Sequence, residues 1–180
     1  MRSIIFASLL LMSGPSVLGK VVTHQRPQQP AAPVLRVSIV STNLQYRLSD
    51  QLRVRAMVEN LRYEDIYILN AMWFGHFGSF TLHVLDSSGT EIRPAGPSHA
   101  PILVTLPVDE TQLVRLQYAH FLGSRLSTPL EFLNIRRPGR YGIFVEYESP
   151  IRDSDVSVKP FWGSEKGPIK SAVVWIQVRR

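Results

Sequence analysis

The sequence predicts an all-β fold, an antiparallel β-sandwich of about seven to nine strands. Three observations predict it. Apolar and polar residues alternate with the period of a β-strand in segment after segment, most clearly over Gln51–Asn60. No stretch keeps a helical period beyond about a dozen residues. A turn at Pro138-Gly139 leads into an alternating segment that starts at Tyr141, because Pro fixes φ and Gly accepts a positive φ.

The 180 residues divide into three expected parts. Residues 1–19 have the form of a secretory signal peptide, with Arg2 before an apolar stretch at 4–12 and a helix break at Gly14-Pro15. An uncleaved anchor is the alternative. Residues 20–33 form a Pro/Gln-rich linker, and residues 34–180 form the sandwich domain. No later apolar run reaches spanning length, so we expect no transmembrane span after signal removal.

The strands expected in chain order share period-two alternation, and turn residues separate them. They cover residues 34–41, 51–60, 65–71, 79–85, 90–92, 111–118, 130–135, 141–147 and 171–178. Asp86 to Gly89 is a hairpin turn. The Pro-rich loop 93–107 has room for a short edge strand at 102–104, and residues 151–168 form a second long loop. The pattern of residues 119–128 does not distinguish a short helix from a loop.

Composition points to export and to an anionic environment. The formal net charge is +6, and sixteen Arg stand against four Lys. Arg binds carboxylate, sulfate and phosphate groups in a bidentate manner, although a solvated surface explains the same composition. The chain has no Cys, so core burial alone must hold it together. The chain also has no glycosylation sequon. Together, the absence of Cys and of a sequon favours a secreted or periplasmic bacterial protein.

Three segments resemble the immunoglobulin-like sandwiches of bacterial secreted proteins. They are Arg-Val-Arg-Ala-Met-Val-Glu-Asn at 53–60, the strand and Asp-x-x-Gly-x-Glu hairpin at 80–91, and Pro-Gly-Arg-Tyr at 138–141. The resemblance implies that Tyr141 forms a tyrosine corner. Ile143 stands where antibody-type domains have a Cys, so aliphatic packing replaces the disulfide. The order of the strand, the Asp-x-x-Gly hairpin and the Pro-Gly-x-Tyr motif is also similar to that of small bacterial proteinase-inhibitor sandwiches. This sequence has no reactive-loop signature that would assign inhibition to particular residues.

The motif search predicts that the chain is not an enzyme and needs no cofactor. There is no Cys nucleophile, Gly-x-Ser-x-Gly elbow, His-Glu-x-x-His pair or phosphate loop. The five histidines are scattered and predict no metal site. Glu148, Asp153 and Asp155 offer carboxylates for Ca²⁺, but calcium needs six to eight oxygen ligands, so a turn-forming loop is the favoured interpretation.

Two groups of residues are candidate binding surfaces. The first is aromatic and consists of Trp73, Phe74, His76 and Phe77 in one loop and Trp162 in another. The alternative is that these loops fold over their own core. The second depends on residues 34–41, 51–60 and 111–118 being neighbouring strands. Arg36, Arg53, Arg55 and Arg115 would then share one outer face, unless Glu59 and solvent neutralise it.

We therefore expect a non-catalytic exported module that binds a protein or an anionic cell-surface polysaccharide. A secreted proteinase inhibitor is the alternative. No nucleic-acid partner is expected.

Overall fold

The computed structural model describes residues 34–75, 78–95 and 109–180. The chain divides into two compact units, Met1–Ala31 and Ala32–Arg180, and all described residues belong to the second. The expected signal peptide, the linker and the edge strand at 102–104 lie outside the described residues. Within the described part, no helix has the length and apolar character needed to cross a membrane.

A three-stranded antiparallel sheet forms one layer of the domain, with the order β1-β3-β8. Its strands are β1 (Leu35–Ser41), β3 (Gln51–Asn60) and β8 (Phe121–Pro129). β3 has a hydrogen-bonded neighbour on both sides, and its two faces differ sharply because one packs on the core and the other faces solvent. Leu52, Val54, Ala56 and Val58 are all buried, and Gln51, Arg53 and Arg55 are exposed. The alternation of apolar and polar residues in the sequence therefore corresponds to the buried and exposed faces of β3.

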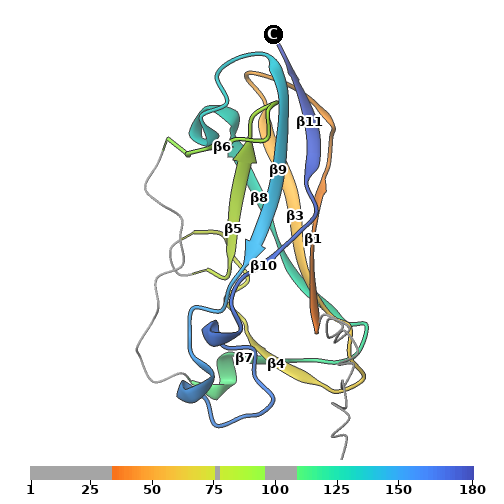
Figure 1. The fold of residues 1–180 in the computed structure, drawn as a ribbon, viewed down its shortest axis with the longest axis vertical. Helices are drawn as coiled ribbons and strands as arrows, with labels where there is room; N and C mark the ends of the chain where they lie inside the picture. The colour runs from red at the N-terminus through yellow and green to blue at the C-terminus, as the bar shows by residue number, and fades with distance from the viewer. Residues whose placement is uncertain (1–33, 76–77, 96–108) are drawn as a thin grey trace, which may run out of the picture. The chain divides into compact units, whose positions relative to one another are not determined.

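A six-stranded sheet forms the second layer (Figure 1), with the order β2-β11-β9-β5-β6 and β10 paired beside β9. The strands are β2 (Gln45–Arg47), β5 (Phe80–Leu85), β6 (Glu91–Ile92), β9 (Gly139–Tyr147), β10 (Ile169–Lys170) and β11 (Val174–Arg179). Every pair is antiparallel except β2 with β11, which is parallel.

The two layers enclose one apolar core. Ile143, Val145 and Tyr147 of β9 are fully buried in it, which confirms the interior face predicted from their alternation. Full burial of one such aliphatic side chain stabilises the fold by about 1.5–3 kcal/mol. Ile143 therefore stabilises the contact between the layers by aliphatic packing.

The strand order is that of an immunoglobulin-like sandwich, and the predicted fold class is confirmed. β1, β3 and β8 take the places of strands A, B and E, while β5, β9 and β11 take those of C, F and G. β9 begins at Gly139, which lies in the strand without the positive φ expected of a turn residue. Tyr141 is the third residue of β9, and its hydroxyl donates a hydrogen bond of 3.0 Å to the carbonyl oxygen of Arg137. This bond to the backbone four residues upstream is the contact expected of a tyrosine corner.

A third, two-stranded sheet lies at one end of the sandwich, at the bottom of Figure 1. It pairs β4 (Ile66–Leu69) with β7 (Leu113–Leu116). The long segment between β9 and β10 contains two short 3-10 helices, η3 (Asp153–Asp155) and η4 (Ser164–Lys166). A second apolar cluster joins this segment to the small sheet, with Leu69, Ala71, Ile151, Val156 and Phe161 buried in it.

Three sequence-based expectations are wrong. Residues 121–129 form strand β8, neither a helix nor a loop. β8 is an edge strand whose inner face is only half-buried, so its apolar signal is weak. The strand within 111–118 pairs with β4 and not with β3. Residues 130–135 begin with the 3-10 helix η2 (Leu130–Leu133), and β2 is an additional strand.

Candidate binding surface

The expected arginine face is present only in part. Arg53 and Arg55 are exposed on β3. Arg36 lies on β1 opposite Glu59 and donates to its carboxylate from Nε at 3.0 Å. Arg115 is elsewhere: it lies on β7, and its Nε donates to Asp65 at 2.5 Å. Hydrogen bonding to Asp65 is the main cause that raises the pKa of Arg115. The prediction that all four arginines share one face is therefore wrong.

The residue that replaces Arg115 in this surface is Arg125, which the sequence analysis missed. β8 brings Arg125 directly opposite Arg55. Both are exposed, and neither makes an ion pair with a described residue. Like charges directly opposite on paired strands repel. The outer face of the three-stranded sheet thus carries Arg53, Arg55 and Arg125, and Glu59 neutralises Arg36.

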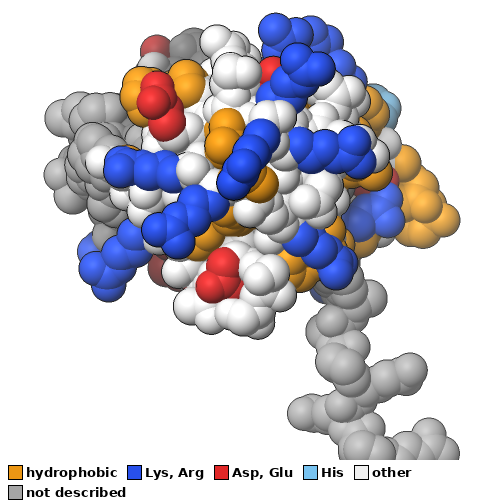
Figure 2. Space-filling view, turned by 90° about the horizontal axis from the view of Figure 1, so that it is seen from above, with side chains coloured by type: hydrophobic (Ala, Val, Ile, Leu, Met, Phe, Trp, Pro, Cys, Tyr) orange, Lys and Arg blue, Asp and Glu red, His pale blue; other side chains and the backbone are white. Residues whose placement is uncertain are grey.

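A larger group of arginines lies at the end of the sandwich where β9 begins and β11 finishes. We call it the arginine end; its members are exposed and make no ion pair with a described residue: Arg47, Arg93, Arg136, Arg137, Arg140, Arg179 and Arg180. The segments that carry them, 45–50, 93–95, 131–140 and 174–180, contain two acids, Asp50 and Glu131. Figure 2 looks onto this end and shows basic side chains spread across it, with few acidic ones.

The parallel pairing of β2 with β11 places two of these arginines side by side. Gln45 is the partner of Gln177, and Arg47 is the partner of Arg179. Tyr46 and Val178 alternate with them and are buried in the core, so the polar partners face outward. Neighbouring strands lie about 4.8 Å apart. Core burial of Tyr46 and Val178 therefore fixes Arg47 and Arg179, which carry like charges, as outward-facing neighbours on adjacent strands.

A shallow hollow of about 160 Å³ lies beside this pair. Its lining is part apolar and part polar: Leu44, Gln45, Arg140, Trp175, Ile176 and Gln177. The guanidinium of Arg140 lies over the Trp175 ring, 4.5 Å from its centroid. Stacking on an aromatic face fixes the guanidinium plane while leaving N–H donors for a ligand.

The chemistry that this arrangement can perform is recognition of repeated negative charges. Each guanidinium presents five donors in a planar fork that fits a carboxylate or sulfate in a bidentate manner. The two glutamine amides add donors and acceptors for hydroxyl groups, and Trp175 adds an apolar, polarisable face. Cations spread over several strands fit an extended partner with charges at intervals.

The aromatic candidates mostly cover the protein's own core. Phe74 is partly buried and packs on Phe80, with the ring centroids 5.6 Å apart. Trp162 is also partly buried against the main core. Trp73 differs, since 49% of it is exposed. His76 and Phe77 lie outside the described residues. Of the aromatic candidates that the structure describes, Trp73 is thus the one best placed for a partner.

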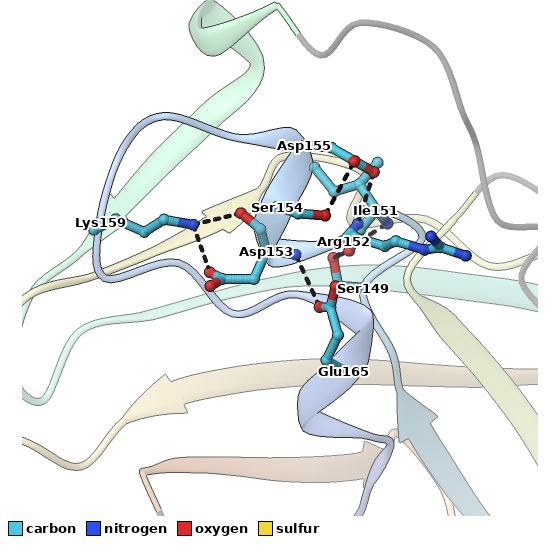
Figure 3. A network of polar contacts seen from close by, with 8 residues as sticks. All are labelled: Ser149, Ile151, Arg152, Asp153, Ser154, Asp155, Lys159 and Glu165. Atoms are coloured by element: carbon cyan, nitrogen blue, oxygen red, sulfur yellow. Dashed lines mark hydrogen bonds and ion pairs between the residues drawn. The ribbon is translucent and has the colours of Figure 1, made fainter.

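The acidic loop considered for calcium is organised by its own backbone (Figure 3). Asp153 accepts from the Lys159 ammonium at 3.0 Å, and Asp155 accepts from the Arg152 backbone N–H at 3.4 Å. Glu165 accepts from the Asp153 backbone N–H at 2.8 Å. Burial, with a smaller contribution from Glu146, raises the pKa of Glu148. Nowhere in the described residues do three or more His, Cys, Asp or Glu side chains form a group that could hold a metal.

A His–carboxylate pair lies on the outer face of the six-stranded sheet. His83 Nδ1 is 2.6 Å from Glu91 Oε1, and the imidazole stacks on Phe144 with the ring centroids 4.6 Å apart. Glu146 lies on the other side, 4.0 Å from His83 Nε2. These contacts orient the ring on the sheet surface and fasten the short β6 hairpin to β9.

No protein-family model matches this chain, and no curated protein matches it. Three solved structures of β-glucosidase from Listeria innocua match this chain. The complex with glucose has a TM-score of 0.39 and covers 90% of this chain. The complex of a D270A mutant with laminaribiose has a TM-score of 0.38 and covers 93%, and the complex with isofagomine has a TM-score of 0.37 and covers 92%. Each is 14% identical to this chain, which spans about a fifth of their length.

Proposed function

We propose that this protein is a non-catalytic, exported module that binds an anionic cell-surface polysaccharide through the arginine end. The observation that carries the proposal is the pairing of Arg47 with Arg179 on adjacent strands, within a group of arginines that make no ion pair with a described acid. Burial of the neighbouring apolar residues keeps these like charges on adjacent strands, and an anionic partner would reduce the repulsion between them. The export signal expected at residues 1–19 supports the surface location.

The hollow at Trp175 favours a polysaccharide over a protein as the partner. Arg140 is stacked on the indole, and Gln45 and Gln177 flank it. A charged sugar chain offers carboxylates or sulfates to the arginines, hydroxyl groups to the amides and an apolar ring to the part of the indole that lines the hollow beside Arg140. One sugar unit can make all three contacts, whereas a protein would have to supply them from separate side chains.

Retention on immobilised heparin and co-sedimentation with an insoluble uronate polymer test the proposal. The double variant Arg47→Ser/Arg179→Ser should weaken binding about tenfold, because each exposed charge contact contributes up to about 1 kcal/mol. Arg53→Ser/Arg55→Ser is the matched control, since it removes the same charge from the outer face of the three-stranded sheet. Neutral dextran should bind no variant.

Equal loss of binding in both double variants would show that net charge alone is responsible and would reject the arginine end as a site. Undiminished binding in Arg47→Ser/Arg179→Ser would reject it as well. Inhibition of broad-specificity proteinases that is unaffected by either double variant would favour the inhibitor alternative.

A further inference from the structure

A second cavity lies at the end of the sandwich opposite the arginine end, and the proposed function does not use it. Its volume is about 350 Å³, within the range of about 300–1,000 Å³ typical of small-molecule pockets. It lies beside the start of β1, the end of β3 and the segment between β9 and β10. One part of its wall is apolar: Val34, Ile66, Pro160, Phe161 and Trp162.

The apolar wall is held in place before any ligand arrives. Tyr67 of β4 donates from its backbone N–H to the Pro160 carbonyl at 2.8 Å, and Trp162 donates to the Tyr67 carbonyl at 2.9 Å. Phe161, between them, is 2% exposed and belongs to the second apolar cluster. A wall fixed by backbone bonds and a buried anchor needs little ordering on binding, which favours affinity.

The charged part of the lining is predominantly cationic. It consists of Arg62, Lys159, Lys166 and Asp153. Lys159 is paired with Asp153 at 3.0 Å. Arg62 and Lys166 are exposed, and neither makes an ion pair with a described residue. Two cations that pair with no described residue therefore line the same hollow as the apolar wall.

We infer that this cavity binds a small organic anion of about monosaccharide size. The anionic group, a carboxylate or sulfate, lies on Arg62 and Lys166, and a ring with an apolar face packs on Pro160 and Trp162, with Phe161 buried behind them as the anchor of the wall. Both an acidic sugar and an aromatic carboxylate have this chemistry. The site is separate from the arginine end, because β1, β3 and β9 each run from one to the other.

Tryptophan fluorescence gives a direct test, since the chain has three tryptophans. In the full chain with Trp73→Phe and Trp175→Phe, Trp162 is the sole reporter. Glucuronate and benzoate are the probes, and glucose is the neutral counterpart. We expect a saturable change with at least one anion and none with glucose. Amide chemical shifts of residues 159–166 in the unaltered chain provide a second readout.

Arg62→Gln and Lys166→Gln should each weaken the anion's Kd about fivefold. Arg137→Gln, at the arginine end, is the matched control and should leave it unchanged. Arg47→Ser/Arg179→Ser should lose the polymer and keep the small anion, so the two sites fail independently. No saturable response to either anion in both readouts, an equal response to glucose, or a response unaffected by Arg62→Gln and Lys166→Gln would overturn the inference.

Discussion

Two tyrosines of β9 provide a test in which the same substitution has opposite effects. Both hydroxyl groups belong to the inward-facing row of the strand. Tyr147 is fully buried, and its hydroxyl has no hydrogen-bond partner among the described residues. The Tyr141 hydroxyl donates to the Arg137 carbonyl at 3.0 Å. Replacement of each Tyr by Phe removes one oxygen atom and leaves the ring.

The expected magnitudes follow from these surroundings. An unpaired buried hydroxyl costs about 1–3 kcal/mol, and Tyr147→Phe removes that cost while the edge contact with Phe80, 5.7 Å between centroids, stays. Lost dispersion contacts offset part of the gain. We expect a net stabilisation of about 1 kcal/mol. Tyr141→Phe loses one bond and should destabilise by about 0.5–1.5 kcal/mol.

Urea unfolding at neutral pH measures both values, and the Tm of each variant should move by about 2–4 °C per kcal/mol in a domain of this size. Burial also raises the pKa of Tyr147. Ionisation therefore favours the unfolded chain as the pH rises above about 10, and Tyr147→Phe should reduce this alkaline loss of stability. A Tyr147→Phe variant less stable than the wild type would show that the hydroxyl has a partner and would refute the reasoning.

Three further predictions concern the outer surface. Asp86 accepts hydrogen bonds, chiefly from the Ser88 hydroxyl and also from backbone N–H groups, and these bonds lower its pKa. The stability that the ionised carboxylate contributes is present above the unfolded pKa and is lost as the pH falls below it. Urea unfolding below about pH 4 should therefore show a smaller loss of stability for Asp86→Asn than for the wild type. Gly123→Ala should destabilise by about 1–3 kcal/mol in the same assay, since the added Cβ would lie 2.1 Å from a carbonyl oxygen of β3; an unchanged midpoint would contradict the close approach. Arg125→Glu should gain about 0.2–1 kcal/mol at low salt by facing Arg55, and a salt-independent effect would argue against an ion pair.

Strands with a clear apolar face were predictable from the sequence, whether they lie inside a sheet, as β3 does, or at its edge, as β1 does. β3 has the bounds predicted for it, because burial on one face and solvent on the other impose alternation along its whole length. β8 contains Gly123 and several hydroxyl residues, and its inner face is only half-buried. The alternation of β8 is therefore too weak to predict a strand from the sequence.

The candidate binding surface was predictable only residue by residue. Alternation correctly placed Arg53 and Arg55 on an outer face. It could not show that β8 supplies Arg125 as their neighbour or that β7 takes Arg115 away to Asp65. Arg47 and Arg179 are far apart in the sequence, and only the parallel register of β2 with β11 brings them together. Whether these side chains bind a partner stays a prediction.

The short strand β2 also has a mechanical consequence. It runs parallel to β11, and the backbone bonds Gln177 N–H to Leu44 carbonyl (2.8 Å) and Leu48 N–H to Arg179 carbonyl (3.1 Å) flank the pair. A pull that drags β2 and β11 in opposite directions along their axes loads these bonds together, in shear, and they cannot open one after another. A pull of this kind would therefore load the β2–β11 pair as one unit.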